Sequence, residues 1–394
     1  MSGLPASAGA ETLALQQELA RLQALLEASR QIHGTIVLDE VIRCTLEIAV
    51  KELEASGAFL TPGETLAGAA VTTYGGVPEL WAKGLEREAW SGFPQIPLHD
   101  KRGRELTRLV LLRDAPLSLE EQDFLEGLAL QSAVALENAR HHSRMLAWER
   151  VQQDLAAARV IQRSLLPQSI PHIPGYLTGF RATSCYEVGG DYVDMIPLGD
   201  GRVVMIVADV AGKGLASALV SASFRMAFRA MATAGIPLNE LAARLNDLHH
   251  AEGIEARRRY VTAILLLLDP AAHQVRVVNA GHTPGFLVGP GIDPVLLESS
   301  GPPLGMLPGM TYETDVRGLP PGGRVLLYTD GLSEVFRGDD EEFGSERLLD
   351  CFAKASCDNC QDALEYLWKE LADFSGNAEQ SDDMTALALM RGSL

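Results

Sequence analysis

The sequence is poor in cysteine. Its five cysteines are an odd number at scattered positions, which argues against a disulfide framework. Cys351, Cys357 and Cys360 lie close together in the chain, but no fourth cysteine or histidine stands at zinc-finger spacing. We therefore interpret these three as reduced thiols on or beside a helix.

Long apolar runs are also missing. The longest, such as Ala263–Leu268, are far too short to cross a bilayer. The first residues have neither the basic nor the apolar segment of a secretory signal. We expect a cytoplasmic protein with no membrane partner.

Basic residues are scarce as well. Lysine and arginine together number 33 against 52 aspartates and glutamates, which gives a formal net charge of −19. Proteins that hold nucleic-acid backbones generally show a basic patch. The compact basic run Arg257–Arg259 is interpreted as a solvated helix end or loop, so the composition predicts no nucleic-acid partner.

The chain does contain enough apolar residues, 47% of 394, for the cores of two or three domains. After a disordered segment at 1–10, residues 11–50 show helical spacing with a stripe of leucines. Turn signals then bound short strands at Gly57–Thr61, Leu66–Tyr74 and Leu106–Leu112, around a helix near Glu79–Trp90.

A long helix is predicted to join the two halves of the chain. It begins at Ser118, whose spacing to Glu121 is that of a capping box, and it ends before Pro167. Its section 141–166 has apolar residues at heptad spacing, which favours a parallel coiled coil and a homodimer; one helix packed on its own domain is the alternative. The seam consists of Trp148, Val151, Leu155, Ala158, Gln162 and Leu165.

Beyond Pro174, strands and helices follow in mixed order, which favours an α+β layered domain over a doubly wound sheet. Helices are expected near Leu215–Ala234, Leu238–His250, Ser345–Lys354 and Asp362–Phe374.

Aspartates stand at the ends of three apolar strands in this region. Asp209 ends the run that starts at Val204, Asp330 follows Val325–Thr329, and Asp382 and Asp383 precede the run that begins at Thr385. A carboxylate at the end of a buried strand needs a partner to stay charged, and hard divalent cations are the natural counter-charge. We expect these carboxylates to converge at one polar edge.

Six motifs follow one another in the C-terminal half, and together they resemble the SpoIIE/RsbU-like branch of the metal-dependent (PPM-type) serine/threonine protein phosphatases. The resemblance covers about residues 158–391. The motifs are Glu187–Asp194, Asp209–Gly214, Asn279–Pro284, Pro303–Met306, Tyr328–Glu334 and Asp382–Thr385.

This resemblance implies a four-layer α-β-β-α sandwich over 167–394 with two divalent cations, Mn²⁺ or Mg²⁺. In the family pattern Asp209 bridges both ions with help from the carbonyl of Val210. Asp330 and Asp382 hold one ion, and Asp191 reaches the other. Such a pair lowers the pKa of a water molecule and clamps the phosphoryl oxygens.

Neighbouring residues receive supporting roles. In an extended strand Asp194 faces away from Asp191, so it is expected to support the site without touching metal. Asp382 and Asp383 cannot both point the same way, and the family pattern favours Asp382. Lys213, where a helix begins, either attracts a phosphate or is an ordinary solvated lysine.

Two positions depart from many relatives outside this branch. Ala211 and Gly212 follow Val210 where those relatives carry a histidine, and no matching arginine is evident near the start of the domain. The branch commonly lacks both. The donor of the proton to the leaving oxygen stays open, with a metal-bound water the simplest candidate. His282 has two interpretations, a general acid and a turn-forming residue, and the second is favoured.

The order of elements over 11–140 resembles a small α/β GAF-like sensor or dimerisation domain, although its strand region is short. A degenerate dimerising module and a sensor of an unknown ligand or protein are both open. We hypothesise that signals acting on 11–140 change the packing of the 141–166 helix and thereby metal binding.

The predicted function is a regulated Mn²⁺/Mg²⁺-dependent protein serine/threonine phosphatase. The resemblance implies a phosphorylated STAS-domain anti-anti-sigma factor as substrate, in a partner-switching pathway. A nucleotide cyclase is disfavoured because Tyr192-Val193 replaces Glu-Phe after Gly-Gly-Asp191. A pseudophosphatase scaffold would lack a ligand, whereas every expected aspartate is present.

Overall fold

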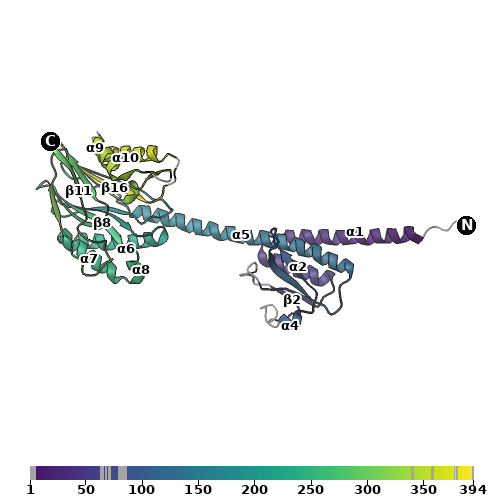
Figure 1. Ribbon diagram of the computed structural model, residues 1–394. Helices are drawn as coiled ribbons and strands as arrows, with labels where there is room; N and C mark the ends of the chain where they lie inside the picture. The colour runs from purple at the N-terminus through teal and green to yellow at the C-terminus, as the bar shows by residue number, and fades with distance from the viewer. Residues whose placement is uncertain are drawn as a thin grey trace. The chain divides into compact units, whose positions relative to one another are not determined.

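The computed structural model describes residues 6–62, 66, 69, 72–78, 87–338, 341–355, 359–376, 378 and 380–392. The chain divides into two compact units, Met1–Gln152 and Gln153–Leu394, each with its own core (Figure 1). Among the described residues, no helix combines the length and apolar character needed to span a membrane.

The N-terminal unit packs helices against one antiparallel sheet of order β2-β1-β4-β3. In helix α2 (Leu38–Glu52) the buried residues Val41, Ile42 and Ala49 recur at helical spacing, so one face covers the sheet. The sheet consists of β1 (Gly57–Leu60), β2 (Thr73–Gly75), β3 (Gln95–His99) and β4 (Glu105–Leu112).

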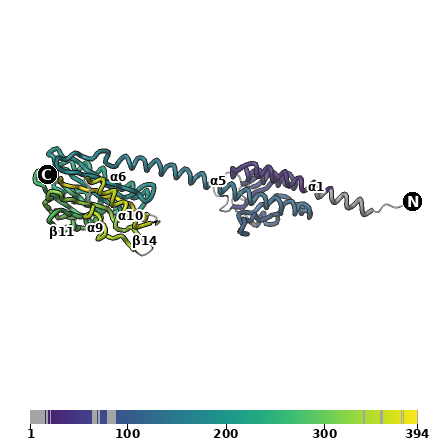
Figure 2. The backbone as a smooth tube through the Cα atoms, turned by 90° about the horizontal axis from the view of Figure 1, so that it is seen from above, coloured from purple at the N-terminus to yellow at the C-terminus, as the bar shows by residue number. Residues whose placement is uncertain are grey.

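Helix α1 (Ala6–His33) lies alongside the first part of α5 (Leu119–Leu165), where Ser29 Oγ donates to Gln131 Oε1 at 3.1 Å (Figure 2). Its start at Ala6 differs from the disorder expected over 1–10, because the segment is rich in the strong helix formers Ala, Leu, Glu and Gln.

Three further differences concern this unit. Strand β3 was not predicted, because a proline inside a segment argues against a strand unless the strand lies at the edge of a sheet. Strand β3, which contains Pro97, is such an edge strand. The strand predicted at Leu66–Tyr74 corresponds to β2 from Thr73 onward, and its remainder lies largely outside the described residues. The helix predicted near Glu79–Trp90 is described only as α4 (Arg87–Trp90).

The boundaries predicted for α5 are close to those observed. Ser118 and Glu121 form the capping box: Glu121 N donates to Ser118 Oγ at 3.2 Å, and Ser118 N donates to Glu121 Oε2 at 2.7 Å. Along the heptad seam, Trp148 and Val151 are 64% and 49% exposed, whereas Leu155, Ala158, Gln162 and Leu165 are half-buried.

The C-terminal unit is a four-layer α-β-β-α sandwich, which confirms the predicted fold. Two five-stranded antiparallel sheets face each other across an apolar core, and further apolar clusters lie between each sheet and its helices. Helices α6 (Leu215–Ala232) and α7 (Leu238–Ala251) cover one sheet, and α9 (Gly344–Lys354) and α10 (Cys360–Ser375) cover the other (Figure 1). The predicted helix ends are within two residues of these bounds.

The first sheet has the order β11-β10-β13-β16-β5, and its strands are Ile292–Leu297, Gly285–Gly289, Arg324–Tyr328, Met384–Arg391 and Tyr176–Thr183. The second has the order β12-β9-β8-β7-β6, with strands Asp315–Gly318, Gln274–Ala280, Val261–Asp269, Val203–Val210 and Tyr192–Pro197. Short elements are α8 (Ile254–Arg257), the 3-10 helix η2 (Asp330–Leu332), β14 (Phe336–Arg337) and β15 (Glu341–Glu342).

Candidate metal centre

Five aspartates gather where strands of the two sheets begin or end. Asp209 is the penultimate residue of β7 and Asp191 immediately precedes β6, both in one sheet. In the other sheet Asp330 follows β13 by two residues, and Asp382 and Asp383 lead into β16. The fold thus brings segments that are far apart in the chain to one edge of the sandwich.

Two glycines show how closely these segments approach each other. A Cβ atom on Gly190 would lie 3.4 Å from Asp209 Oδ1 and 3.0 Å from the carbonyl oxygen of Val210. A Cβ atom on Gly331 would lie 3.4 Å from Asp382 Cβ. At Gly331 a Cβ atom would also lie 2.0 Å from the carbonyl oxygen of Asp383, so this position requires glycine, whereas the fit at Gly190 is tight.

The carboxylates repel one another in a poorly solvated place. Burial is the largest cause that raises the pKa of Asp209 to about 7, and the charges of Asp330, Asp382 and Asp383 add to it. Burial is also the largest cause that holds the pKa of Asp191 well above its ordinary value, and the charges of Asp209 and Asp383 add to it. Cations would remove this penalty, and an all-oxygen donor set suits Mg²⁺ or Mn²⁺. The residues fit such a group.

Asp383 holds the Gly-Gly-Asp loop. Its Oδ1 accepts a hydrogen bond from Cys185 N at 2.8 Å and its Oδ2 one from Gly190 N at 2.7 Å. A Cβ atom on Gly189 would lie only 2.2 Å from Asp383 Oδ2. Sequence reasoning gave Asp383 a supporting role but did not foresee these partners, because they lie almost 200 residues away.

Asp382 is paired with Lys213. The Nζ atom of Lys213 lies 2.9 Å from Asp382 Oδ2 and donates to the carbonyl of Ser381 at 2.7 Å. In the described part of the chain, no three Asp, Glu, His or Cys side chains are placed so that they could hold a metal ion together. An ion bound at Asp382 would have to compete with the Lys213 ammonium.

Thr329 links the two sheets at the site. Its hydroxyl donates to Asp191 Oδ2 at 2.8 Å, and its oxygen accepts a hydrogen bond from Thr385 N at 3.0 Å. It orients Asp191 from the opposite sheet. Sequence reasoning missed Thr329, although its place directly before Asp330 was a signal.

Asp194 makes its contacts with residues outside the carboxylate cluster. It is 1% exposed, accepts a hydrogen bond from Tyr192 Oη at 2.6 Å, and forms an ion pair with Arg229 at 2.8 Å. These contacts tie β6 to α6.

His282 bridges the sheets as a neutral group. Its Nδ1 lies 2.8 Å from Thr262 Oγ1 and its Nε2 lies 3.0 Å from the carbonyl oxygen of Tyr328. Burial lowers the pKa of His282 to about 4. With both ring nitrogens engaged, the side chain holds the turn that Asn279 also braces, because His282 N donates to Asn279 Oδ1 at 2.8 Å.

Known structures share the fold of the C-terminal unit. The SiaA-PP2C domain of Pseudomonas aeruginosa superposes with a TM-score of 0.55 at 23% identity, over 62% of this chain and 98% of that one. The RsbU and RsbW domains of Rv1364c from Mycobacterium tuberculosis give a TM-score of 0.52 at 28% identity, over 58% of this chain and 63% of that one. Fold and carboxylate edge together define a PP2C-type phosphatase domain.

Residues 199–392 match the family model described as stage II sporulation protein E (SpoIIE). This part of the C-terminal unit is thus similar to the SpoIIE family of PP2C-type phosphatase domains, and domains of this family are generally metal-dependent. The phosphoserine phosphatase RsbP of Bacillus subtilis is 31% identical over 186 residues, which are 46% of this chain. The match covers 45% of RsbP, so the chain spans less than half the length of this curated relative.

Proposed function

We propose that this protein is a regulated Mn²⁺- or Mg²⁺-dependent protein serine/threonine phosphatase that hydrolyses a phosphoserine or phosphothreonine monoester. The observation that carries the proposal is the gathering of five buried or half-buried aspartates from both sheets at one edge. A pseudophosphatase scaffold would lack part of this cluster.

The proposed ligand set is that of the family pattern. Asp209 would hold both ions with help from the Val210 carbonyl, Asp330 and Asp382 would hold one of them, and Asp191 the other. When bound, the ions supply charge neutralisation for the phosphate and a water of lowered pKa. Thr329 orients Asp191, and Asp383 fixes the backbone of the Gly-Gly-Asp loop. His282 stays outside proton transfer because it is buried, neutral and engaged at both nitrogens.

The proposed substrate is a phosphorylated STAS-domain anti-anti-sigma factor in the cytoplasm. This proposal is supported by the likeness to RsbP, named a phosphoserine phosphatase, and to a structure of RsbU and RsbW domains.

The regulatory part of the proposal concerns the 141–166 helix. Gln162 accepts a hydrogen bond from Gly189 N at 3.1 Å and donates to Gly189 O at 2.7 Å. Arg225 Nε donates to the carbonyl of Leu165 at 2.9 Å. The end of α5 is thus hydrogen-bonded to the loop that carries Asp191. These bonds support coupling between the metal centre and a GAF-like region at 11–140, whether or not that region binds a ligand.

The test is Mn²⁺-dependent phosphate release from a phosphorylated STAS-domain protein, with Asp209→Asn as the control. We expect release by the wild type alone, and none when Mn²⁺ is chelated. A scaffold would bind the phosphoprotein without turnover, which would refute the enzymatic proposal.

A further inference from the structure

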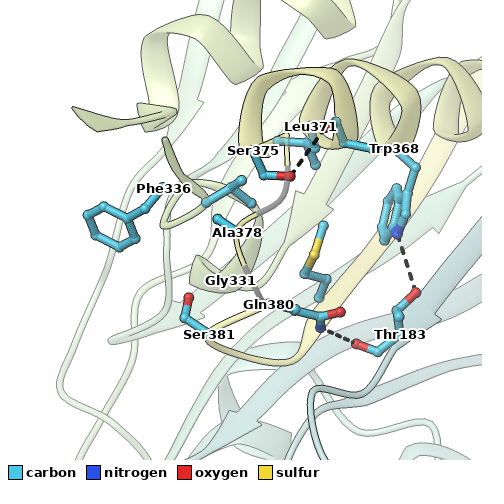
Figure 3. A pocket seen from close by; sticks show the side chains of 12 residues that line it. Thr183, Gly331, Phe336, Trp368, Leu371, Ser375, Ala378, Gln380 and Ser381 are labelled. Atoms are coloured by element: carbon cyan, nitrogen blue, oxygen red, sulfur yellow. Dashed lines mark hydrogen bonds between the residues drawn. The ribbon is translucent and has the colours of Figure 1, made fainter. Parts of the chain in front are cut away.

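A cavity of about 190 Å³ opens beside the carboxylate cluster. Helix α10 forms one wall through Trp368, Leu371 and Ser375, and the segment that leads to β16 forms another through Gln380 and Ser381 (Figure 3). The metal proposal does not use it.

The cavity and the proposed metal centre share a wall. Gly331 follows Asp330, Ser381 precedes Asp382 and Met384 follows Asp383, and all three line the cavity. A Cβ atom on Gly331 would lie 3.4 Å from Asp382 Cβ, so only a thin layer separates cavity and cluster. A phosphoprotein bound at the aspartates would therefore lie against this opening.

The polar groups of the wall are already bonded to one another. Trp368 Nε1 donates to Thr183 Oγ1 at 3.3 Å, and Gln380 Nε2 donates to the carbonyl of Thr183 at 3.1 Å (Figure 3). Ser375 Oγ donates to Ala372 O at 3.2 Å. Among the described residues that line it, none is charged. The occupant that gains most here is apolar.

The size of the cavity favours a side chain over a free ligand. Pockets for small molecules usually enclose about 300–1,000 Å³, more than is present here. One aliphatic side chain needs less room, and in an extended substrate successive residues are about 3.3–3.4 Å apart. A residue a few positions from the phosphorylated one reaches the opening.

We propose that this cavity is a specificity pocket that takes one apolar side chain of the phosphorylated protein substrate, close to the phosphoserine. The inference rests on the proposed phosphatase function and adds a substrate feature to it.

The experiment uses the full chain with Mn²⁺ and a set of phosphoserine peptides. A single leucine is moved through each position from four before to four after the phosphoserine in a glycine-serine background. We expect leucine at one position to raise kcat/KM about tenfold, because its side chain then enters the cavity and buries apolar surface. Para-nitrophenyl phosphate, which has no such residue, reports the chemistry alone.

The variant Ala372→Trp fills the cavity from an exposed position on α10. It should abolish the leucine preference while hydrolysis of para-nitrophenyl phosphate and of the leucine-free peptide is unchanged. Ala353→Trp, at an exposed position on α9 away from the cavity, is the matched control and should behave as the wild type. If Ala372→Trp melts at a lower temperature than the wild type, Ser375→Phe fills the cavity from the next turn and replaces it.

No positional preference in the wild type, or a preference that survives the filled cavity, overturns the pocket while the phosphatase stands. Loss of para-nitrophenyl phosphate hydrolysis in a stably folded filled variant also overturns it, because the cavity then serves the chemistry itself. No hydrolysis of any probe by the wild type rejects the proposed function, and this inference with it.

Discussion

At the scale of residues, the carboxylate cluster is balanced by one nearby ammonium group. Lys213 pairs with Asp382 at 2.9 Å. Burial and then the charge of Asp382 raise the pKa values of Asp330 and Asp383, and burial and the charges of these neighbours raise that of Asp209. The Lys213 side chain is 47% exposed and that of Asp382 31% exposed. The pair is weak enough to yield to a dication.

The variant Lys213→Met should therefore bind Mn²⁺ more tightly than the wild type. A partly exposed ion pair contributes up to about 1 kcal/mol, so its removal should lower the dissociation constant by up to about fivefold. Isothermal titration calorimetry measures this, with Lys354→Met, which removes the surface pair with Asp350, as control. Weaker Mn²⁺ binding by Lys213→Met would show that the lysine helps to build the site.

His282 predicts a pH dependence of stability. In the unfolded chain His282 takes up a proton near its ordinary pKa of 6.5, whereas in the folded chain it takes up a proton only near pH 4. The unfolded state then binds more protons between these values, so the free energy of unfolding falls as the pH drops through this window.

In His282→Gln this contribution to the pH dependence should disappear. The free energies of unfolding measured in urea at pH 7.5 and pH 4.5 should therefore differ less than in the wild type. An equal difference in both proteins would mean that His282 is not held neutral.

Sequence patterns predicted those candidate site residues whose surroundings are local. Asp209 and Asp330 stand at the ends of apolar strands, and a strand end is visible in the chain itself. Thr329 and Asp383 were missed or undervalued because their partners, Asp191 and Gly190, come from distant segments. Pairings of this kind depend on how two sheets stack, which no local pattern encodes.

At the scale of elements, the end of helix α5 is the part that touches the site. Gln162 makes two hydrogen bonds to the backbone of Gly189, two residues before Asp191. The heptad pattern included Gln162 as a seam position, but it could not show that the residue faces the chain's own domain. Helical periodicity reveals which face is buried and leaves the covering element undetermined.

The variant Gln162→Ala should weaken Mn²⁺ binding and para-nitrophenyl phosphate hydrolysis together, without changing a ligand. Loss of two hydrogen bonds of about 0.5–1.5 kcal/mol each corresponds to a decrease of about fivefold to about a hundredfold. Gln153→Ala, at an exposed position of the same helix, is the control. Unchanged Mn²⁺ affinity in Gln162→Ala would separate α5 from control of the site.

At the scale of the whole molecule, the open question is whether the seam also joins two chains. Its N-terminal part exposes Trp148 and Val151, and Met145 one turn earlier is 60% exposed. Large apolar side chains in one stripe favour a partner helix. The C-terminal part, from Leu155 onward, is half-buried within a single chain.

We predict that the full-length protein is a homodimer and that the double variant Trp148→Glu, Val151→Glu is a monomer, because facing glutamates repel each other. Sedimentation velocity distinguishes the two. Arg150→Glu changes charge off the seam and should leave the dimer intact. A wild-type monomer at micromolar concentration would restrict the seam to packing within one chain.

The most direct test of the metal centre is the number of Mn²⁺ ions bound by each chain, measured by calorimetry on the full-length protein and on Asp209→Asn. We predict two ions for the wild type and, for Asp209→Asn, loss of saturable binding of at least one, since this residue is assigned to both ions. Absence of saturable binding in the wild type, or identical titrations of the two proteins, would contradict the assignment of the carboxylate edge as a two-metal centre.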